Sequence, residues 1–183
     1  VDNPYQLFSH SDQQAQWQST SSDAPSRTGW GGRLADAMKA SNGAAAMPVT
    51  TSIAGSVLYG QGTATSALTV PSSGTFGLSD TGASTAARAR QAALSALLGE
   101  GRDHTLVAET ADGLANAVNL SGVVNPVITA ANTTVTSLFD TTGNSLAAQL
   151  QQVAKLIAAR DTFGVKRQIF FVSLGGFDTH TNE

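Results

Sequence analysis

The sequence predicts an α/β fold in which a mostly parallel sheet is flanked by helices. Apolar residues recur at helical spacing over residues 145–160, and after a short loop a nearly unbroken apolar run covers residues 169–174. A helix, a short loop and a strand buried on both faces make up half of a parallel crossover unit. The chain is long enough for one core, so we expect residues 1–183 to be part of a single α/β domain.

The amino-terminal part of the chain predicts a loop followed by a helix. Residues 1–28 are rich in Gln and Ser and lack apolar periodicity, so they are expected to form an extended loop. Over residues 31–40, apolar side chains fall on one helical face, and Asn42 and Gly43 supply a stop signal. A short amphipathic helix is therefore expected there.

The middle of the chain changes character twice. In residues 50–78, Ser, Thr and Gly alternate with apolar and β-branched residues, which predicts a small β-rich insertion of two or three short strands or a hairpin. Ser84 or Thr85 is expected to cap the helix that follows. Residues 103–139 are apolar but are interrupted by glycines and Pro126, which predicts several helical segments separated by turns.

Charge and composition exclude several classes of partner and site. The net charge is −3 and only 13% of residues are charged, without a block of Lys or Arg, so we expect no nucleic-acid partner. No apolar run reaches the roughly 18 to 20 residues that a membrane span needs. The absence of cysteine excludes disulfides, thiolate metal sites and a cysteine nucleophile.

A pair of metal-ligand residues follows the predicted buried strand. Asp178 and His180 lie two residues apart, so their side chains point to the same side where the segment is extended. Gly175 and Gly176 allow the chain to turn just before them, at the end of the strand where parallel sheets bind ligands. A carboxylate with an imidazole suits a divalent ion such as zinc, with calcium or manganese as alternatives. The simpler alternative is that Asp178 caps a turn and His180 is a surface residue.

His10 is the second candidate, as a residue that lines a substrate pocket. It stands among polar side chains ahead of Trp17, although a solvated loop explains the same pattern. Residues 60–62 read Gly-Gln-Gly but lack the third glycine of a dinucleotide-binding fingerprint, so a turn is expected. His104, beside Asp103, is expected at a helix start rather than in a catalytic site.

Three segments together resemble domain-of-unknown-function family 1501, a group of exported bacterial proteins related to the alkaline phosphatase and sulfatase superfamily. The last of the three segments is the most specific. The segments are Leu7-Phe8-Ser9-His10 with Gln14 and Trp17, then Thr28-Gly29-Trp30-Gly31-Gly32-Arg33-Leu34, and then Val172-Ser173-Leu174-Gly175-Gly176-Phe177-Asp178-Thr179-His180.

The resemblance implies an alkaline phosphatase-like or sulfatase-like α/β fold, export through a twin-arginine type of signal to the periplasm or the cell exterior, and a metal centre. Asp178 and His180 would then be metal ligands, and the metal would assist hydrolysis of a small phosphate or sulfate ester. In the family's complete pattern, a signal region and an early strand precede Val1, and a segment bearing His and Asp follows Glu183. The chain therefore resembles a middle fragment in which the fold is incomplete.

Two hypotheses about function come from different classes of protein. The first is a metal-dependent phosphatase-type or sulfatase-type hydrolase, whose 183-residue piece we expect to be inactive because two ligands leave an ion mostly hydrated. The second is a non-catalytic cell-envelope or interaction protein that keeps the fold and uses its middle part, residues 50–78, as a binding surface. The metal content of the full-length protein separates them.

Overall fold

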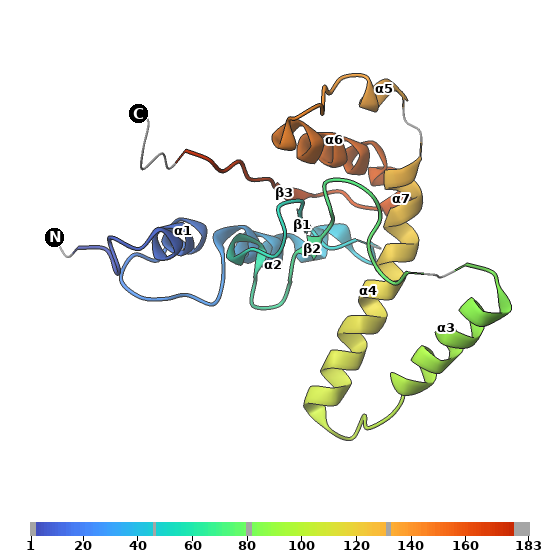
Figure 1. Cartoon of the computed structure of the whole chain (residues 1–183). Helices are drawn as coiled ribbons and strands as arrows, with labels where there is room; N and C mark the ends of the chain where they lie inside the picture. Colours follow the sequence, from blue (N-terminus) through green and yellow to red (C-terminus); the bar gives the residue numbers. More distant parts are fainter. Residues whose placement is uncertain (1–2, 46, 80–81, 131–132, 178–183) are drawn as a thin grey trace. The chain divides into compact units, whose positions relative to one another are not determined.

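The computed structural model describes residues 3–45, 47–79, 82–130 and 133–177 (Figure 1). The chain divides into two compact units, one formed by Val1–Gly74 with Ala130–Glu183 and the other by Thr75–Thr129. The second unit consists of the middle segment of the chain, whose two helices form a hairpin.

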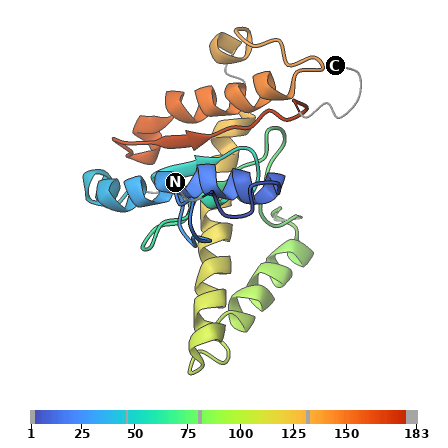
Figure 2. The same cartoon turned by 90° about the vertical axis from the view of Figure 1, so that its left-hand side faces the viewer.

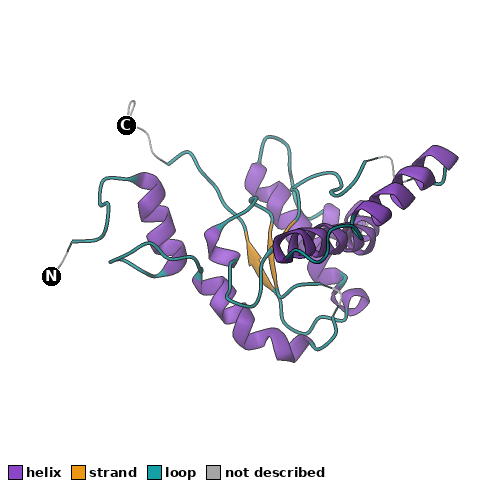
Figure 3. Cartoon of the chain, turned by 90° about the horizontal axis from the view of Figure 1, so that it is seen from below, coloured by secondary structure: helices purple, strands orange, loops and turns teal. Residues whose placement is uncertain are grey.

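The first unit contains a small open sheet of three parallel strands flanked by helices, as Figure 3 shows. The strands are β1 (Thr50–Ser52), β2 (Leu68–Thr69) and β3 (Ile169–Phe171), in the order β2-β1-β3. Thr51 of β1 lies opposite Leu68 of β2 on one side and Phe170 of β3 on the other. The predicted class, helices around a parallel sheet, is confirmed at this level.

The central strand of the sheet is made of small polar residues. Thr50, Thr51 and Ser52 are all buried, although the sequence places them in a β-rich insertion rather than in the main sheet. The alternative of a hairpin is also wrong, because β1 and β2 are parallel. A parallel pair requires a long crossover, and the connection from β1 to β2, which includes the 3-10 turn η1 (Leu58–Gly60), supplies it.

The apolar strand β3 is less buried than the sequence predicts. Its residues are half-buried rather than enclosed on both faces. Within the part of the chain that the structure describes, β3 is an edge strand with β1 on one side only. Its amino end is held by Asn42, whose Oδ1 accepts the N–H groups of Lys166 and Arg167 at 2.9 and 2.8 Å. The Asn42 Nδ2 donates to the Arg167 carbonyl at 2.8 Å.

The expected loop over residues 1–28 contains a helix, α1 (His10–Ser19). Its start is fixed by Ser9, whose Oγ accepts the Asp12 N–H, and its end by Thr20 in a left-handed conformation. The prediction was wrong because it relied on apolar periodicity, which this polar helix lacks. Capping and docking stabilise the helix instead, since the Gln18 Oε1 accepts the Tyr59 N–H at 2.8 Å.

The remaining helices of the first unit largely match the sequence prediction. Helix α2 (Trp30–Asn42) ends at Gly43, and α6 (Ser145–Ala158) begins after the side-chain cap of Asn144. Two short helices, α5 (Thr133–Thr136) and α7 (Arg160–Phe163), lie on either side of α6 in the chain. The fully buried apolar side chains that form the core of this unit are Ala35, Val70, Leu156 and Phe163.

The second unit is a helical hairpin of α3 (Thr85–Leu97) and α4 (Thr105–Thr129). Ser84 caps α3 as predicted, but α4 is one continuous helix rather than several segments. Its glycines stay helical, and Pro126 lies in the last turn, so the hydrogen bond that its missing N–H cannot make is lost close to the end of the helix. Within the described ranges, no helix combines the length and the apolar character that a membrane crossing requires.

Candidate functional site

Three loops leave the same edge of the sheet, because all three strands are parallel. We call this edge the carboxyl rim and define it as residues 53–56 after β1, residues 70–73 after β2 and residues 172–177 after β3 (Figure 1). In open parallel sheets, ligands bind in the crevice beyond this edge. A ligand-binding site is therefore expected at the carboxyl rim.

The loops after β1 and β3 turn away from the sheet through glycines. Ser52 is fully buried and its Oγ donates to the Gly55 carbonyl at 2.6 Å, which fixes the turn after β1. Gly55 and Gly176 have φ angles of 85° and 90°, which residues with a side chain rarely adopt. The chain can therefore bend sharply at both points and leave backbone accessible at the rim.

A glutamine from α6 holds the segment that follows β3. The Gln149 Nε2 donates to the Ser173 carbonyl at 2.8 Å, and the Ser173 N–H donates to the Gln149 Oε1 at 2.9 Å. Gln149 is only 8% exposed, whereas Ser173 is exposed, so these bonds are partly shielded from water. Figure 2 shows α6 running alongside β3 and its continuation.

A second glutamine, one turn further along α6, holds the segment that follows β2. The Gln152 Nε2 donates to the Pro71 carbonyl at 3.1 Å, and the side chain is 2% exposed. Its Oε1 is buried and has no hydrogen-bond partner among the described residues. Helix α6 therefore fixes two of the three rim loops through buried amide groups. Sequence reasoning expected the apolar side chains of α6 to face inward and missed this role, because glutamine on a helix is ordinarily exposed.

Asp178 and His180 lie outside the residues that the structure describes, so their predicted convergence on one point stays a prediction. The last described residue is Phe177, whose side chain is 79% exposed. Across the described part of the chain, no cluster of three or more His, Asp or Glu side chains could hold a metal ion. The described rim therefore supplies backbone and neutral side chains, and metal ligands would have to come from elsewhere.

His10 is the first residue of α1, and it is exposed. It lines a shallow depression of about 410 Å³ together with Leu7, Phe8, Gln13 and Gln14. Trp17 lies seven residues further on the same helical face but packs on Trp30, with ring centroids 6.4 Å apart. The two residues that the sequence grouped into one pocket wall thus have different surroundings.

An aromatic chain connects α1 to the sheet. Trp30 meets Tyr59 edge to face at 4.7 Å, and Tyr59 meets Phe171 of β3 at 5.0 Å between ring centroids. Burial raises the pKa of the Tyr59 phenol above its usual value. The sequence showed these aromatics as isolated residues, and only the tertiary structure brings them together.

The Trp-Gly-Gly-Arg segment at the start of α2 is a packing motif. A Cβ on Gly32 would lie 2.1 Å from the Gln61 carbonyl carbon. Only glycine at this position therefore leaves room for the backbone of residues 61–62 beside the helix. The Arg33 guanidinium donates to the carbonyls of Ser19 and Thr28 at 2.8 and 3.1 Å, which ties the end of α1 to the start of α2.

The loop after η1 binds a carboxylate of the same chain. Asp36 accepts the N–H groups of Thr63 and Ala64 at 2.7 and 3.1 Å and the Thr65 hydroxyl at 2.7 Å. The Thr65 hydroxyl first, and then the Thr63 N–H, lower the pKa of Asp36. A side chain of the same chain therefore occupies the donors of residues 63–65, directly after the Gly-Gln-Gly segment.

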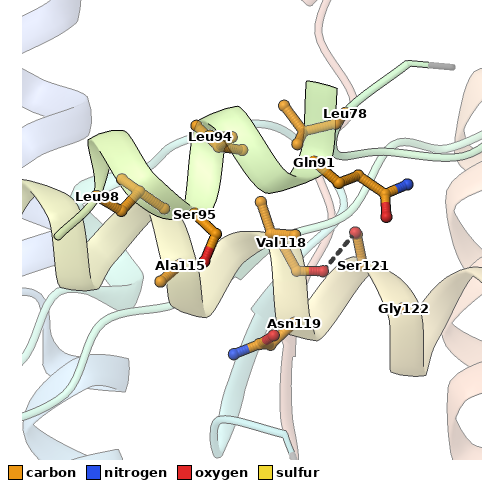
Figure 4. A pocket seen from close by; sticks show the side chains of 10 residues that line it. All are labelled: Leu78, Gln91, Leu94, Ser95, Leu98, Ala115, Val118, Asn119, Ser121 and Gly122. Atoms are coloured by element: carbon orange, nitrogen blue, oxygen red, sulfur yellow. Dashed lines mark hydrogen bonds between the residues drawn. The ribbon is translucent and has the colours of Figure 1, made fainter. Parts of the chain in front are cut away.

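The second unit has a pocket of about 380 Å³ between α3 and α4 (Figure 4). None of the described residues that line it carries a titratable group, and the Ser121 hydroxyl is already bonded to the Val118 carbonyl at 2.7 Å. Such a lining can bind an apolar group but offers no acid, base or activated nucleophile. The lining residues are Leu78, Gln91, Leu94, Ser95, Leu98, Ala115, Val118, Asn119, Ser121 and Gly122.

Comparison with known proteins found no relative of this chain. No family model, no curated protein and no solved structure matches the chain.

Proposed function

We propose that the chain belongs to an exported, metal-dependent protein that hydrolyses small phosphate or sulfate esters, as its resemblance to domain-of-unknown-function family 1501 implies. The finer fold in this proposal is an alkaline phosphatase-like or sulfatase-like sheet. The observation that carries the proposal is the parallel pairing of β3 with β1. The segment leading to Asp178 and His180 consequently leaves the sheet at the rim, where ligands of parallel sheets are bound.

The chemistry of the two side chains fits a divalent ion. Zinc takes carboxylate oxygen and imidazole nitrogen at about 2.0–2.2 Å, usually with at least one further protein ligand. Asp178 and His180 supply one donor of each kind, and the additional ligands would come from the longer protein. When bound, such an ion would activate a nucleophile and stabilise the charge that develops on a phosphoryl or sulfuryl group.

The deciding experiment measures the metal content of the full-length protein after exhaustive dialysis, by plasma mass spectrometry. We expect close to one equivalent or more of zinc, manganese or calcium. Less than about a tenth of an equivalent contradicts the hydrolase proposal, because a built site retains its ion through dialysis.

Matched variants assign the metal to the rim. His180→Ala is expected to weaken metal binding by well over tenfold, since even residues that only orient a ligand contribute about 10-fold to 100-fold. His104→Ala is the control, because His104 is exposed and belongs to the second unit. Equal losses in both variants would exclude His180 as a ligand.

The second candidate is a non-catalytic cell-envelope or interaction protein that retains the fold. The observation that favours it is the exposure of large apolar side chains in the second unit, where Leu97 and Leu106 are 69% and 83% exposed. Where such side chains form one contiguous patch, they mark a surface that binds another molecule. A dialysed protein without metal, still folded and able to bind an envelope component, would select this candidate.

A further inference from the structure

We infer that Gln149 is the positioning residue of the metal-ligand segment: its amide fixes the point from which the chain leaves the sheet toward Asp178 and His180. That Asp178 and His180 are metal ligands rests on the proposed function. The pair of hydrogen bonds between Gln149 and Ser173, which we call the clamp, rests on the geometry alone.

The clamp replaces a missing rung of the sheet. Along β3, alternate residues bond to β1: the Ile169 N–H donates to the Val49 carbonyl at 2.8 Å, and the Phe171 carbonyl accepts the Ile53 N–H at 2.9 Å. Ser173 is the next residue in this alternation. By that point β1 has ended and turned away through Gly55, and the Gln149 amide bonds both backbone groups of Ser173 instead.

The clamp is also the last fixed point of this segment. Among the described residues, Ser173 is the final one with a hydrogen bond to the rest of the fold. The four residues after it are exposed and include two glycines. Two ligands that follow a segment without other contacts converge on an ion only if the start of that segment is held, because holding it reduces the number of conformations that the ligands can adopt.

Helix α6 is well suited to carry the clamp. Its start is fixed by the Asn144 cap, its Leu156 is fully buried, and Gln152 anchors the same helix to the loop after β2. The position of Gln149 relative to the sheet is therefore set by several independent contacts.

The test uses the full-length protein with two substitutions at the clamp and one control. Gln149→Ala removes both hydrogen bonds, and Gln149→Glu keeps the shape and the acceptor but removes the donor at neutral pH. Gln151→Ala is the control, because Gln151 lies on the same helix and donates instead to the Thr136 carbonyl.

Two readouts are compared in each variant. Hydrogen–deuterium exchange of residues 172–177, measured without metal, reports on the clamp, and competition titration with zinc alone reports on the ligands. We expect at least tenfold faster exchange at Ser173 in Gln149→Ala and a smaller change in Gln149→Glu, because its carboxylate still accepts the Ser173 N–H. Zinc binding should be about 10-fold to 100-fold weaker in both Gln149 variants, and neither quantity should change in Gln151→Ala. Urea unfolding of each variant confirms that the fold is retained.

The outcomes separate the two claims. Unchanged exchange at Ser173 in Gln149→Ala overturns the clamp. Faster exchange with unchanged zinc affinity overturns the positioning role, since the ligands would then be held by other contacts. Failure of the wild-type protein to bind zinc or another divalent ion overturns the proposed function itself, and the positioning role with it, whatever the exchange data show.

Discussion

The substitution Gly32→Ala tests whether the glycines at the start of α2 exist for packing. Gly32 lies inside a helix, where alanine is intrinsically favoured by about 0.5–1 kcal/mol. In an isolated helix the substitution would therefore stabilise. In this protein the added Cβ would lie 2.1 Å from the Gln61 carbonyl carbon, 2.2 Å from its oxygen and 2.3 Å from the Gly62 nitrogen.

The magnitude follows from these distances. Carbon atoms rest at about 3.5–4.0 Å from one another, so the loop would have to retreat by roughly 1.4 Å or more. All three close atoms are backbone, so rotation of a side chain cannot relieve the contact. Overpacking of this kind costs about 1–3 kcal/mol, and the retreat also disturbs the Thr65 bonds to Asp36 and Gly32. We expect a net destabilisation of about 2 kcal/mol.

The assay is urea unfolding followed by tryptophan fluorescence. The chain has only two tryptophans, Trp17 and Trp30, and both belong to the aromatic chain beside the motif. With a urea dependence of about 2 kcal/mol per molar, the midpoint should fall by about 1 M. Gly113→Ala is the control: it also lies inside a helix, but nothing surrounds its added Cβ, so a small gain in stability is expected. A Gly32→Ala protein as stable as the wild type would refute the packing argument.

The remaining predictions concern the contacts around the sheet. Asn42→Ala should lower the unfolding free energy by about 2 kcal/mol in urea titrations, because it leaves the backbone before β3 without three hydrogen bonds; an unchanged midpoint would show that other contacts hold that end of the strand. The lowered pKa of Asp36 means that its contribution to stability is complete above the usual aspartate value of about 3.9 and is lost as the pH falls through the lowered folded value. Urea midpoints measured across this acid range should therefore depend less on pH in Asp36→Asn than in the wild type, and parallel curves would contradict the assignment. Burial raises the pKa of Tyr59, so its phenol should titrate above the usual value of about 10 in ultraviolet absorbance, and Tyr59→Phe should remove that late step.

Local signals in the sequence predicted those elements whose stabilisation is local. The caps at Ser84 and Asn144 lie where the pattern placed them. The face of α6 that is buried differs from the expected apolar one, since Gln149, Gln152 and Leu156 are buried while Leu150 and Ile157 are exposed. Helix α1 was missed because its ends are fixed by Ser9 and Thr20 while its sides dock through polar groups, and neither feature produces an apolar period. Helix α4 was divided wrongly because glycines and a late proline lower helix propensity without forbidding a helix.

The strand that leads toward the candidate site was predicted, but the residues that hold the loops around it were not. The apolar run before the Gly-Gly pair indicated a parallel strand, and β3 pairs in parallel with β1. Gln149 and Gln152 could not be identified from sequence, because a glutamine on a helix is ordinarily exposed. Their function depends on where the loops after β2 and β3 run, which is a non-local property.

The sequence by itself determined the class of fold, the starts of α3 and α6, and the strand that precedes the Gly175-Gly176 pair. These features depend on periodicity, capping and composition within short stretches, which the order of residues contains directly. The tertiary structure alone decided that Thr50, Thr51 and Ser52 form the middle of the sheet, and that Asn42 and Gln149 hold the two ends of β3. The physical reason is that a short polar strand, or a buried amide, is stable only when distant segments supply its hydrogen-bond partners, and local sequence does not record which segments those are.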